Sequence, residues 1–423
     1  MNCVTVAVTI KSHTMMCRAR MTNNTPFINR NSLAGLAATL VGVGIGRFAY
    51  IALMPALIQH GWFNQDQAAY LGVSTLVGYL LGAPLASFLL RFLSPGHLVR
   101  TAMVISTFSY FACAFEQAPL IWFYLWRTLA GTMGALLMIL APPMVLRSVS
   151  PQSKSRISSV VFSGLGIGAM LSGTLIPLLI STSVISTWIG MGVITLLATL
   201  LTWRAWESTS PSSSASYIKA SFSQLSVSQR HCVMLIFIAY TFDAIGYLPH
   251  TLFWVDYIVR DIGMSFSAGG FFWAAFGVGA AIGPILIGIV AEKQGIKLTL
   301  CIAFLFKAIG VGLPLMSIHP SALFISSILV GMFTPVTVML VSTYTLECVG
   351  YELHTKAWGL MTISFALSQG IVGFLMAYLL SQGATYSQLF LVSTPALIIA
   401  ALCVSFSSTQ TQVASPSPAS NRN

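Results

Sequence analysis

The stretch Val41-Gly-Val-Gly-Ile-Gly-Arg-Phe-Ala-Tyr-Ile-Ala-Leu-Met-Pro55 decides how this chain folds. It belongs to an apolar run over residues 32–58, which can cross a membrane as a helix because about 20 residues suffice. Arg47 stands near the middle of that run. A charge at the centre of a bilayer costs about 2.5–3.5 kcal/mol on insertion scales. We therefore expect Arg47 to face a water-filled cavity or a partner, and not lipid.

Glycines recur at every second position of the same stretch, as Gly42, Gly44 and Gly46. A spacing of two cannot place all three on one helix face. We expect them to thin the helix on several sides, where neighbouring helices or a ligand approach.

The composition is that of a membrane protein. Of the 423 residues, 56% are hydrophobic and only 7% are charged, and the mean hydropathy is +0.85. A soluble protein of this length needs more charge. The 20 Lys and Arg are spread over the whole chain, so the net charge of +11 forms no basic face for nucleic acid. The seven cysteines are odd in number and lack metal-ligand spacing, so we predict no disulfide framework, metal or cofactor.

Twelve apolar runs predict an all-α integral membrane protein with twelve transmembrane helices in two pseudo-symmetric halves. A polar leader over 1–31, expected to be disordered and cytoplasmic, precedes them. A serine-rich linker over 206–230 separates an N-terminal half (32–205) from a C-terminal half (231–408), and the tail 409–423 is expected to be disordered. The runs cover 32–58, 67–91, 97–115, 119–146, 155–180, 184–205, 231–257, 266–291, 297–317, 319–347, 355–380 and 386–408.

The positive charges predict the orientation. If the N-terminus is cytoplasmic, the inner segments hold sixteen of the 20 Lys and Arg and the outer loops hold only Arg260. The other three, Arg47, Arg127 and Lys307, lie within spans. By the positive-inside rule both termini and the linker are cytoplasmic, and we expect a multi-pass protein of a bacterial inner membrane, monomeric within the lipid bilayer.

The two halves match at an offset of 200 residues. The hydropathy profiles match as wholes, six runs against six, and this supports a repeat more strongly than single residues do. Secondary transporters are commonly built from two such halves, with the binding site at the midplane between them. The matching residues are Gly46 with Gly246, Pro84 with Pro284, Gly131 with Gly331, and Gly173 with Gly373.

The segment from Gly288 to Lys297, GIVAEKQGIK, resembles the cytoplasmic gate motif of the major facilitator superfamily, Gly-x-x-x-Asp/Glu-Arg/Lys-x-Gly-x-Arg/Lys. The first half keeps only a remnant of this motif and lacks its acid. The resemblance implies gating roles for Gly288, Glu292, Lys293, Gly295 and Lys297.

Three further segments are similar to superfamily motifs. Arg127-Thr-Leu-Ala-Gly131-Thr-Met-Gly134-Ala135 resembles a motif linked with proton coupling. The fifth run, with Gly164, Gly168 and Gly173, is close to an antiporter motif, but Ala169 replaces the proline, which counts against drug antiport. The segment 46–50, GRFAY, looks like the YbfB/YjiJ-type subfamily. The resemblance covers 32–408 and implies a central cavity lined by spans one, four, seven and ten.

Arg47 and Arg127 are expected at nearly the same depth, from their distances along two antiparallel helices. Two arginines at one level of the cavity favour an anionic group such as a carboxylate. The alternative is that one or both only brace helices through backbone carbonyls or Glu116. The span glycines Gly46, Gly131, Gly164, Gly168 and Gly173 are predicted to allow close helix packing.

Asp243 stands in the middle of the seventh run, where a carboxylate is functional by default and can carry a proton. The alternative is a fixed pair between Asp243 and an arginine. We expect Lys307 to snorkel or to meet a helix-packing partner. Asp256, His250 and His319 are expected to be solvated near span ends, Tyr257 to anchor at the interface, and Tyr50, Tyr240 and Tyr247 to line the cavity.

We therefore predict a secondary active transporter of a small organic solute, anionic if the arginines bind it, with the proton as coupling ion. The alternatives are an effluxer of hydrophobic neutral or cationic compounds, an intramembrane enzyme, and a solute sensor on a transporter frame. No nucleophile elbow, paired catalytic cluster or Walker loop is present, so we predict no enzyme activity and no ATP-driven pumping.

Overall fold

The computed structural model describes residues 28–147, 149, 151–207 and 222–408. Of the predicted disordered leader (1–31), linker (206–230) and disordered tail (409–423), the segments 1–27, 208–221 and 409–423 lie outside the described residues, and the last residues of the leader already belong to the helix Arg30–Thr39. The described part contains fourteen α-helices, and ten helices in it are long and apolar enough to cross a membrane.

Six spans form the N-terminal half. The first combines α2 (Arg30–Thr39), the π-helix η1 (Leu40–Ile45) and α3 (Phe48–Gln59). The others are α4 (Gln65–Leu89), α5 (Pro95–Cys113), α6 (Leu120–Arg147), α7 (Pro151–Ile180) and α8 (Val184–Thr202), followed by the 3-10 turn η2 (Trp203–Trp206).

The C-terminal half repeats this plan after the short 3-10 turn η3 (Phe222–Gln224). Its first span combines α9 (Val227–Gly246), α10 (Leu248–Leu252), α11 (Trp254–Asp256) and the π-helix η4 (Tyr257–Asp261). The others are α12 (Phe266–Gln294), α13 (Ile296–Met316), α14 (Pro320–Ser381), which holds two spans joined at Gly350, and α15 (Tyr386–Phe406).

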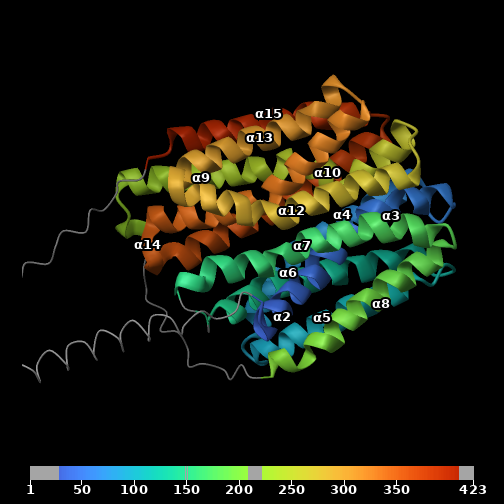
Figure 1. Cartoon of the computed structure of the whole chain (residues 1–423), viewed down its shortest axis with the longest axis horizontal. Coiled ribbons are helices and arrows are strands. Elements are labelled where there is room, and N and C mark those ends of the chain that lie inside the picture. Colours follow the sequence, from blue (N-terminus) through green and yellow to red (C-terminus); the bar gives the residue numbers. More distant parts are fainter. Residues whose placement is uncertain (1–27, 148, 150, 208–221, 409–423) are drawn as a thin grey trace, which may run out of the picture.

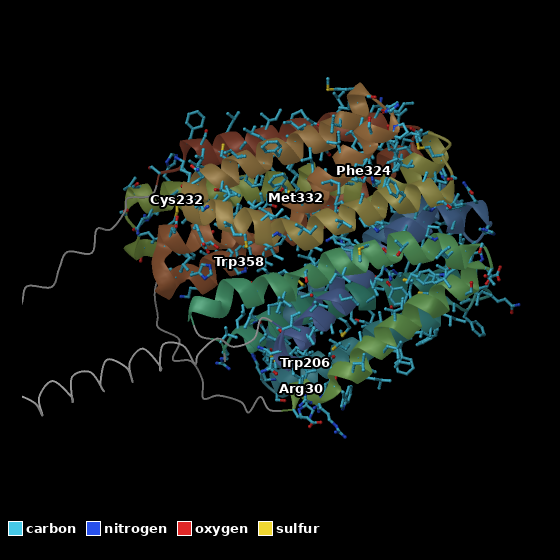
Figure 2. All side chains as sticks on the ribbon, in the orientation of Figure 1. Arg30, Trp206, Cys232, Phe324, Met332 and Trp358 are labelled. Carbon is cyan, nitrogen blue, oxygen red and sulfur yellow. A yellow bond between two sulfur atoms is a disulfide. The ribbon has the colours of Figure 1, made fainter. Side chains whose placement is uncertain are left out.

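The two halves lie side by side as two layers of helices (Figure 1). Helix α7 packs along α12 and α4 packs along α14, so these four helices form the seam between the halves. We call "basic end" the end of the bundle where the first span begins and the sixth ends, marked by Arg30 and Trp206 in Figure 2. At this end Arg91 follows α4, Arg100 lies near the start of α5 and Lys293 lies in the last turn of α12. The other end is the "opposite end".

Turns at helix junctions require glycine. Gly295 joins α12 to α13 with φ +87°, and Gly350 divides α14 with φ +74°. A side chain at such φ values is strained, so only glycine is comfortable there. Gly295 is one of the residues of the predicted gate motif, and its backbone explains why the motif requires glycine at this position.

Glycines pack equivalent helices in the two halves. A Cβ added to Gly131 of α6 would overlap the carbonyl oxygen of Thr75 in α4, and one added to Gly331 of α14 would overlap that of Phe276 in α12. Gly78 and Gly279 likewise meet the carbonyl oxygens of Thr128 and Ile328. The two helix pairs therefore approach to backbone contact at positions related by 200 or 201 residues. This correspondence adds a structural reason to the pairing of Gly131 with Gly331.

The first helix of each half is broken at the same place. In the first span the π-helix η1 ends at Ile45 with Gly46 as its C-cap, and Arg47 is the N-cap of α3. In the seventh span α9 ends at Gly246, and Tyr247 is the N-cap of α10. The first break falls in a sequence of alternating glycine and β-branched residues, which are poor helix formers. Single π turns inside helices are frequent at functional sites.

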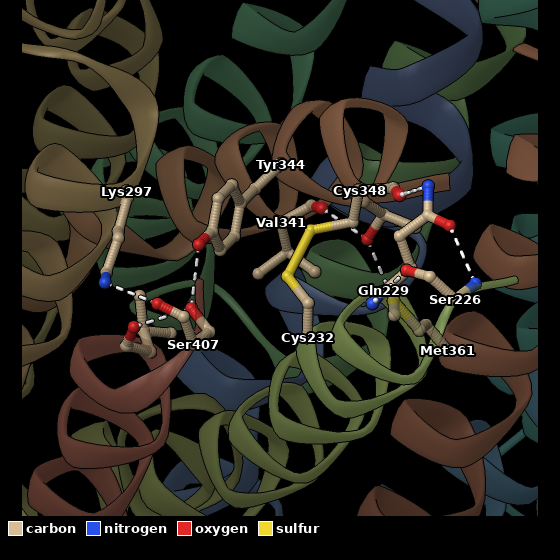
Figure 3. The surroundings of a disulfide bond; sticks show 11 residues. Ser226, Gln229, Cys232, Lys297, Val341, Tyr344, Cys348, Met361 and Ser407 are labelled. Atoms are coloured by element: carbon tan, nitrogen blue, oxygen red, sulfur yellow. Dashed lines mark hydrogen bonds between the residues drawn. A yellow bond between two sulfur atoms is a disulfide. The ribbon is translucent and has the colours of Figure 1, made fainter. Parts of the chain in front are cut away.

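A disulfide joins the seventh and tenth spans at the basic end, and this corrects the prediction that no disulfide would form. Cys232 of α9 and Cys348 of α14 are bonded, with their Cα atoms 6.6 Å apart (Figure 3). The amide of Gln229 donates to the Cys348 carbonyl oxygen at 3.1 Å and fixes the same contact. A separation of 116 residues gives no local spacing signal, so only the tertiary fold brings these thiols together.

Candidate functional site

Arg47 lies at the break of the first span and reaches the other half of the protein. Its side chain is 8% exposed, and its Nη1 donates to Oε1 of Gln369 in α14 at 3.1 Å. Its Nε and Nη2 are buried and have no hydrogen-bond partner among the described residues. Nitrogens without an acceptor on a buried cation are costly in a membrane interior. The site is therefore prepared for an acceptor that the described residues do not supply.

Arg127 braces the break from the side of α6. It is fully buried, and its Nη2 donates to the Gly46 carbonyl oxygen at 2.8 Å. Its guanidinium carbon lies 5.3 Å from the Tyr50 ring centroid and 5.8 Å from that of Tyr110. Tyr110 also donates to the carbonyl oxygen of Ile45. These contacts match the bracing alternative, because the carbonyl groups freed by the break are satisfied by side chains. Glu116, the other partner considered, is exposed.

Asp243 is paired with Lys307, and the prediction of an arginine partner is wrong. Both side chains are fully buried, and Lys307 Nζ lies 2.7 Å from Asp243 Oδ1. Thr337 of α14 donates to Asp243 Oδ2 at 3.0 Å and accepts from Lys307 at 3.3 Å. Lys307 does not snorkel: its ammonium group lies in the centre of the C-terminal half, where the carboxylate offsets its charge. The helix-packing alternative given for Lys307 is the one that the structure shows.

The ion pair connects to Arg47 through two side chains. Lys307 Nζ lies 4.3 Å from the centroid of the Tyr247 ring, on its face. The hydroxyl of Tyr247 accepts a hydrogen bond from Nε2 of Gln369, and Oε1 of the same amide accepts from Arg47. A continuous series of contacts therefore runs from Asp243 to Arg47 and crosses the boundary between the halves.

The three tyrosines expected in the cavity have different surroundings. Tyr247 belongs to this series. Tyr240 stacks on Phe365 with centroids 4.3 Å apart, on the same side of α9. Tyr50 donates to the Ala68 carbonyl oxygen at 2.7 Å and packs against Arg127 inside the N-terminal half. The structure thus brings Arg47 and Tyr247 together and places Tyr50 with the Arg127 brace.

Several residues expected to be solvated near span ends are buried. Asp256 is fully buried, 3.0 Å from Arg260, and accepts from the hydroxyl of Tyr386. His250 is fully buried and lies 2.8 Å from Ser326 Oγ. Tyr257 is buried against Phe390, 5.1 Å between centroids, and not at an interface. These predictions were wrong because the end of the seventh span turns inward as α10, α11 and η4. His319 is exposed at the start of α14.

Contacts between the halves lie at midplane depth and towards the opposite end. Arg260 donates to Oε1 of Gln65 at 2.8 Å, and Phe48 packs edge-on against Trp273, 5.7 Å between centroids. Gly173 of α7 meets Ala274 of α12, and Gly373 of α14 meets Leu76 of α4. These contacts join the two halves between the depth of Arg47 and the opposite end of the bundle.

The glycines of α7 have two distinct neighbours. Gly164 and Gly168 face the first span, where a Cβ would overlap the backbone of Leu36 or Gly44. Gly166 and Gly173 face α12 across the seam, where a Cβ would overlap Ala281 or Ala274. At Gly46 the atoms nearest to an added Cβ belong to the same span, the carbonyl groups of Val41 and Gly42. The glycines therefore permit backbone contact both within a half and between halves.

The predicted gate motif is at the basic end. Glu292 and Lys293 are exposed, and neither has an ion-pair partner among the described residues. Lys297 donates to the Ser407 carbonyl oxygen, which ties α13 to the end of α15 (Figure 3). Gly288 lies near Met339 of α14. The motif thus lies on the C-terminal half, with its acid and base free for partners.

Sequence reasoning missed three residues of the site: Gln369, Thr337 and Phe365. All three are on α14, and none carries a charge that would single it out. Gln369 is 1% exposed within an apolar span, and this is the signal that could have found it, since a buried amide requires hydrogen-bond partners.

Comparison with known proteins places this geometry in a family. Residues 39–405 match the family described as "uncharacterised MFS-type transporter YbfB". A search of curated proteins finds no match. The fold and site define a transporter of the major facilitator type, with two six-helix halves and a polar centre between them. The chain belongs to the YbfB family of these transporters. It is therefore a multi-pass membrane transporter with the twelve-helix fold, and the enzyme alternative falls away.

Proposed function

We propose that this transporter moves a small organic anion by alternating access, and that proton movement through the Asp243–Lys307 pair drives it. The observation that carries the proposal is Arg47, a buried cation at the contact between the halves, two of whose nitrogens have no hydrogen-bond partner among the described residues. Of the nine Asp and Glu, the buried ones in the described part are Asp243 and Asp256, and both are paired with other cations. An anionic substrate would supply the missing charge.

The ion pair supports proton coupling because contacts connect it to the substrate site, so a change in its protonation would affect that site. Protonation of Asp243 would remove its attraction for Lys307. The ammonium group also rests on the ring of Tyr247, and Tyr247 shares Gln369 with Arg47. A change in the pair would therefore alter how firmly Gln369 holds the guanidinium, which is the differential contact that coupling needs.

We further propose that the basic end faces the cytoplasm of a bacterial cell and that the protein works as a monomer in the inner membrane. The concentration of Lys and Arg in the segments at this end supports the orientation. The structure would then represent a state closed at the outer end, where Arg260 holds Gln65.

A thermal-shift screen of the purified protein against metabolites comes first, because a ligand of the native state raises the melting temperature. The solute found is then measured in proteoliposomes with an imposed pH gradient. The double variant Asp243→Asn/Lys307→Met removes both charges together and avoids leaving one buried ion unpaired. We expect it to retain exchange of solute down its gradient and to lose accumulation driven by the pH gradient.

The control is Glu207→Gln, which removes a surface pair with Arg100 at 3.0 Å, and surface pairs contribute about 0–1 kcal/mol. This variant should accumulate solute like the wild type. Undiminished accumulation by the double variant would remove the ion pair from the coupling mechanism. Arg47→Gln should abolish binding of carboxylate solutes and spare neutral ones; equal loss of both would make Arg47 structural.

A further inference from the structure

Four aromatic rings form a stack that leads from the basic end towards Arg47. Trp358 and Phe365 lie seven residues apart on α14. Tyr240 is on α9, and Tyr247, seven residues later, is the C-cap of this helix. Such spacing places each pair on one face of its helix. We call these four residues the aromatic ladder. Trp358, labelled in Figure 2, lies in that view where α14 approaches the N-terminal half.

The rings of the ladder are nearly parallel. Tyr240 lies 5.7 Å from Trp358 with an interplanar angle of 28°, and 4.3 Å from Phe365 with an angle of 21°. Phe365 lies 5.9 Å from Tyr247 with an angle of 22°. These distances are those of stacked aromatic pairs. Tyr240 and Tyr247 are buried, whereas Trp358 and Phe365 are half-buried. Because Tyr240 and Tyr247 both stack on Phe365, the part of its ring that stays uncovered is its edge.

The ladder ends at the free edge of a guanidinium. Gln369, one helical turn after Phe365, binds Arg47 through Nη1 and leaves Nε and Nη2 without a partner. These two nitrogens form the edge of the guanidinium that binds a carboxylate with two parallel hydrogen bonds. The amide therefore orients the guanidinium and leaves its carboxylate-binding edge open.

We propose that the substrate is an aromatic carboxylate, with its carboxylate on the Nε–Nη2 edge of Arg47 and its ring on the ladder beside Phe365. The inference rests on the proposed function and narrows its anion to one chemical class. A planar acid satisfies both features at once, because its carboxylate and ring are joined and its ring can pack edge-to-face against Phe365. An aliphatic acid would satisfy Arg47 alone.

The test compares three probes of similar size on the full-length protein in nanodiscs. Benzoate has both the ring and the charge, cyclohexanecarboxylate has the charge without the aromatic ring, and benzamide has the ring without the charge. Binding is measured by equilibrium competition against radiolabelled benzoate. We expect benzoate to bind about tenfold more tightly than cyclohexanecarboxylate, the effect of about one aromatic pair, and benzamide to compete weakly.

Two variants assign the selectivity to residues. Phe365→Leu should bring the ratio of benzoate to cyclohexanecarboxylate affinity close to one, and Arg47→Gln should lose both acids. The matched control is Phe374→Leu, which changes a phenylalanine on the same helix that packs against Tyr70, 5.3 Å between centroids, away from the ladder. Phe374→Leu should keep the wild-type ratio.

The outcomes separate this inference from the proposed function. If both acids bind equally and Phe365→Leu changes nothing, the aromatic class is wrong while anion binding stands. If neither acid binds but the thermal-shift screen finds an aliphatic anion that Arg47→Gln loses, the aromatic class is again wrong. If the solute found is neutral or cationic and Arg47→Gln leaves its binding intact, the anion proposal fails as well.

Discussion

The first helix of each half breaks at the same depth, but the two breaks carry different chemistry. In both breaks, the carbonyl oxygen of the residue before the glycine accepts a hydrogen bond from a side-chain hydroxyl. Ile45 accepts from Tyr110, and Ile245 accepts from Ser393 at 3.3 Å. Around the first break lie two buried guanidiniums and, in the described part of that half, no buried acid. Near the second break, Asp243 and Lys307 form a buried ion pair.

The difference shows that two halves with the same backbone plan carry different buried charges. The repeat fixes the backbone: the position of the break, the glycine contacts between helices and the direction of each span. The side chains added to it make one half deficient in negative charge and leave the other balanced. Under the proposed function, the half that lacks a buried acid binds the anion and the half with the buried pair carries the proton.

The sharpest way to test this asymmetry is to remove one cation from each half. Lys307→Met leaves Asp243 buried without its partner, and breaking a buried pair costs about 3–5 kcal/mol. Arg47→Met removes a charge that has no ion-pair partner among the described residues and only one hydrogen bond, to Gln369, so we expect little loss of stability or a gain. Thermal unfolding in one detergent should show a large fall for the first variant and none for the second.

The variant Asp243→Asn/Lys307→Met should recover most of the stability lost in Lys307→Met. A fall for Arg47→Met as large as that for Lys307→Met would mean that a counter-ion serves Arg47, and the two halves would not differ in the way described.

Substitutions of the glycines at equivalent helix contacts test the shared helix packing and should have a smaller effect on stability. Gly131→Ala and Gly331→Ala each place a Cβ against a backbone carbonyl of the neighbouring helix, and overpacking of this kind costs about 1–3 kcal/mol. We expect similar losses of thermal stability in both. Gly359→Ala is the control, because a Cβ there meets nothing within 4 Å and alanine favours a helix by up to about 1 kcal/mol. Unequal losses at Gly131 and Gly331 would show that the repeat is not energetically symmetric.

The smallest effect concerns the contact that joins the halves at the opposite end. Gln65→Ala removes the acceptor of Arg260, a bond worth about 1 kcal/mol, which corresponds to roughly a fivefold change in population. Spin labels at His60 and Ser267 should then report a larger fraction of long distances. Gln382→Ala, an exposed amide that contacts its own half, is the control. An unchanged distance distribution would mean that other contacts hold this end closed.

The sequence predicted the twelve-helix fold and the family because these depend on signals that recur along the chain. Apolar runs of span length, short connections and the gate motif all act locally and can be read without a structure. The motif glycine Gly295 is a case where the reason is also local, since its φ of +87° excludes other residues.

The sequence predicted only some of the residues of the candidate site. Arg47 and Asp243 stood out because charges are rare within apolar spans. Their partners did not, because Gln369, Thr337 and Lys307 lie 322, 94 and 64 residues away and only packing brings them near. The arginine assigned to Asp243 was wrong for this reason: two buried arginines were visible in the sequence, and the geometry that selects Lys307 was not. Cys232 and Cys348 were missed in the same way.

The sequence by itself determined that this protein crosses a membrane twelve times, that it is built from two related halves and that charges are buried in its spans. Each follows from the cost of placing polar groups in hydrocarbon, which constrains every helix separately. Only the tertiary structure decided which buried charge is paired and which is left open. Pairing depends on distances of a few ångströms between helices distant in the chain, and no local pattern specifies them.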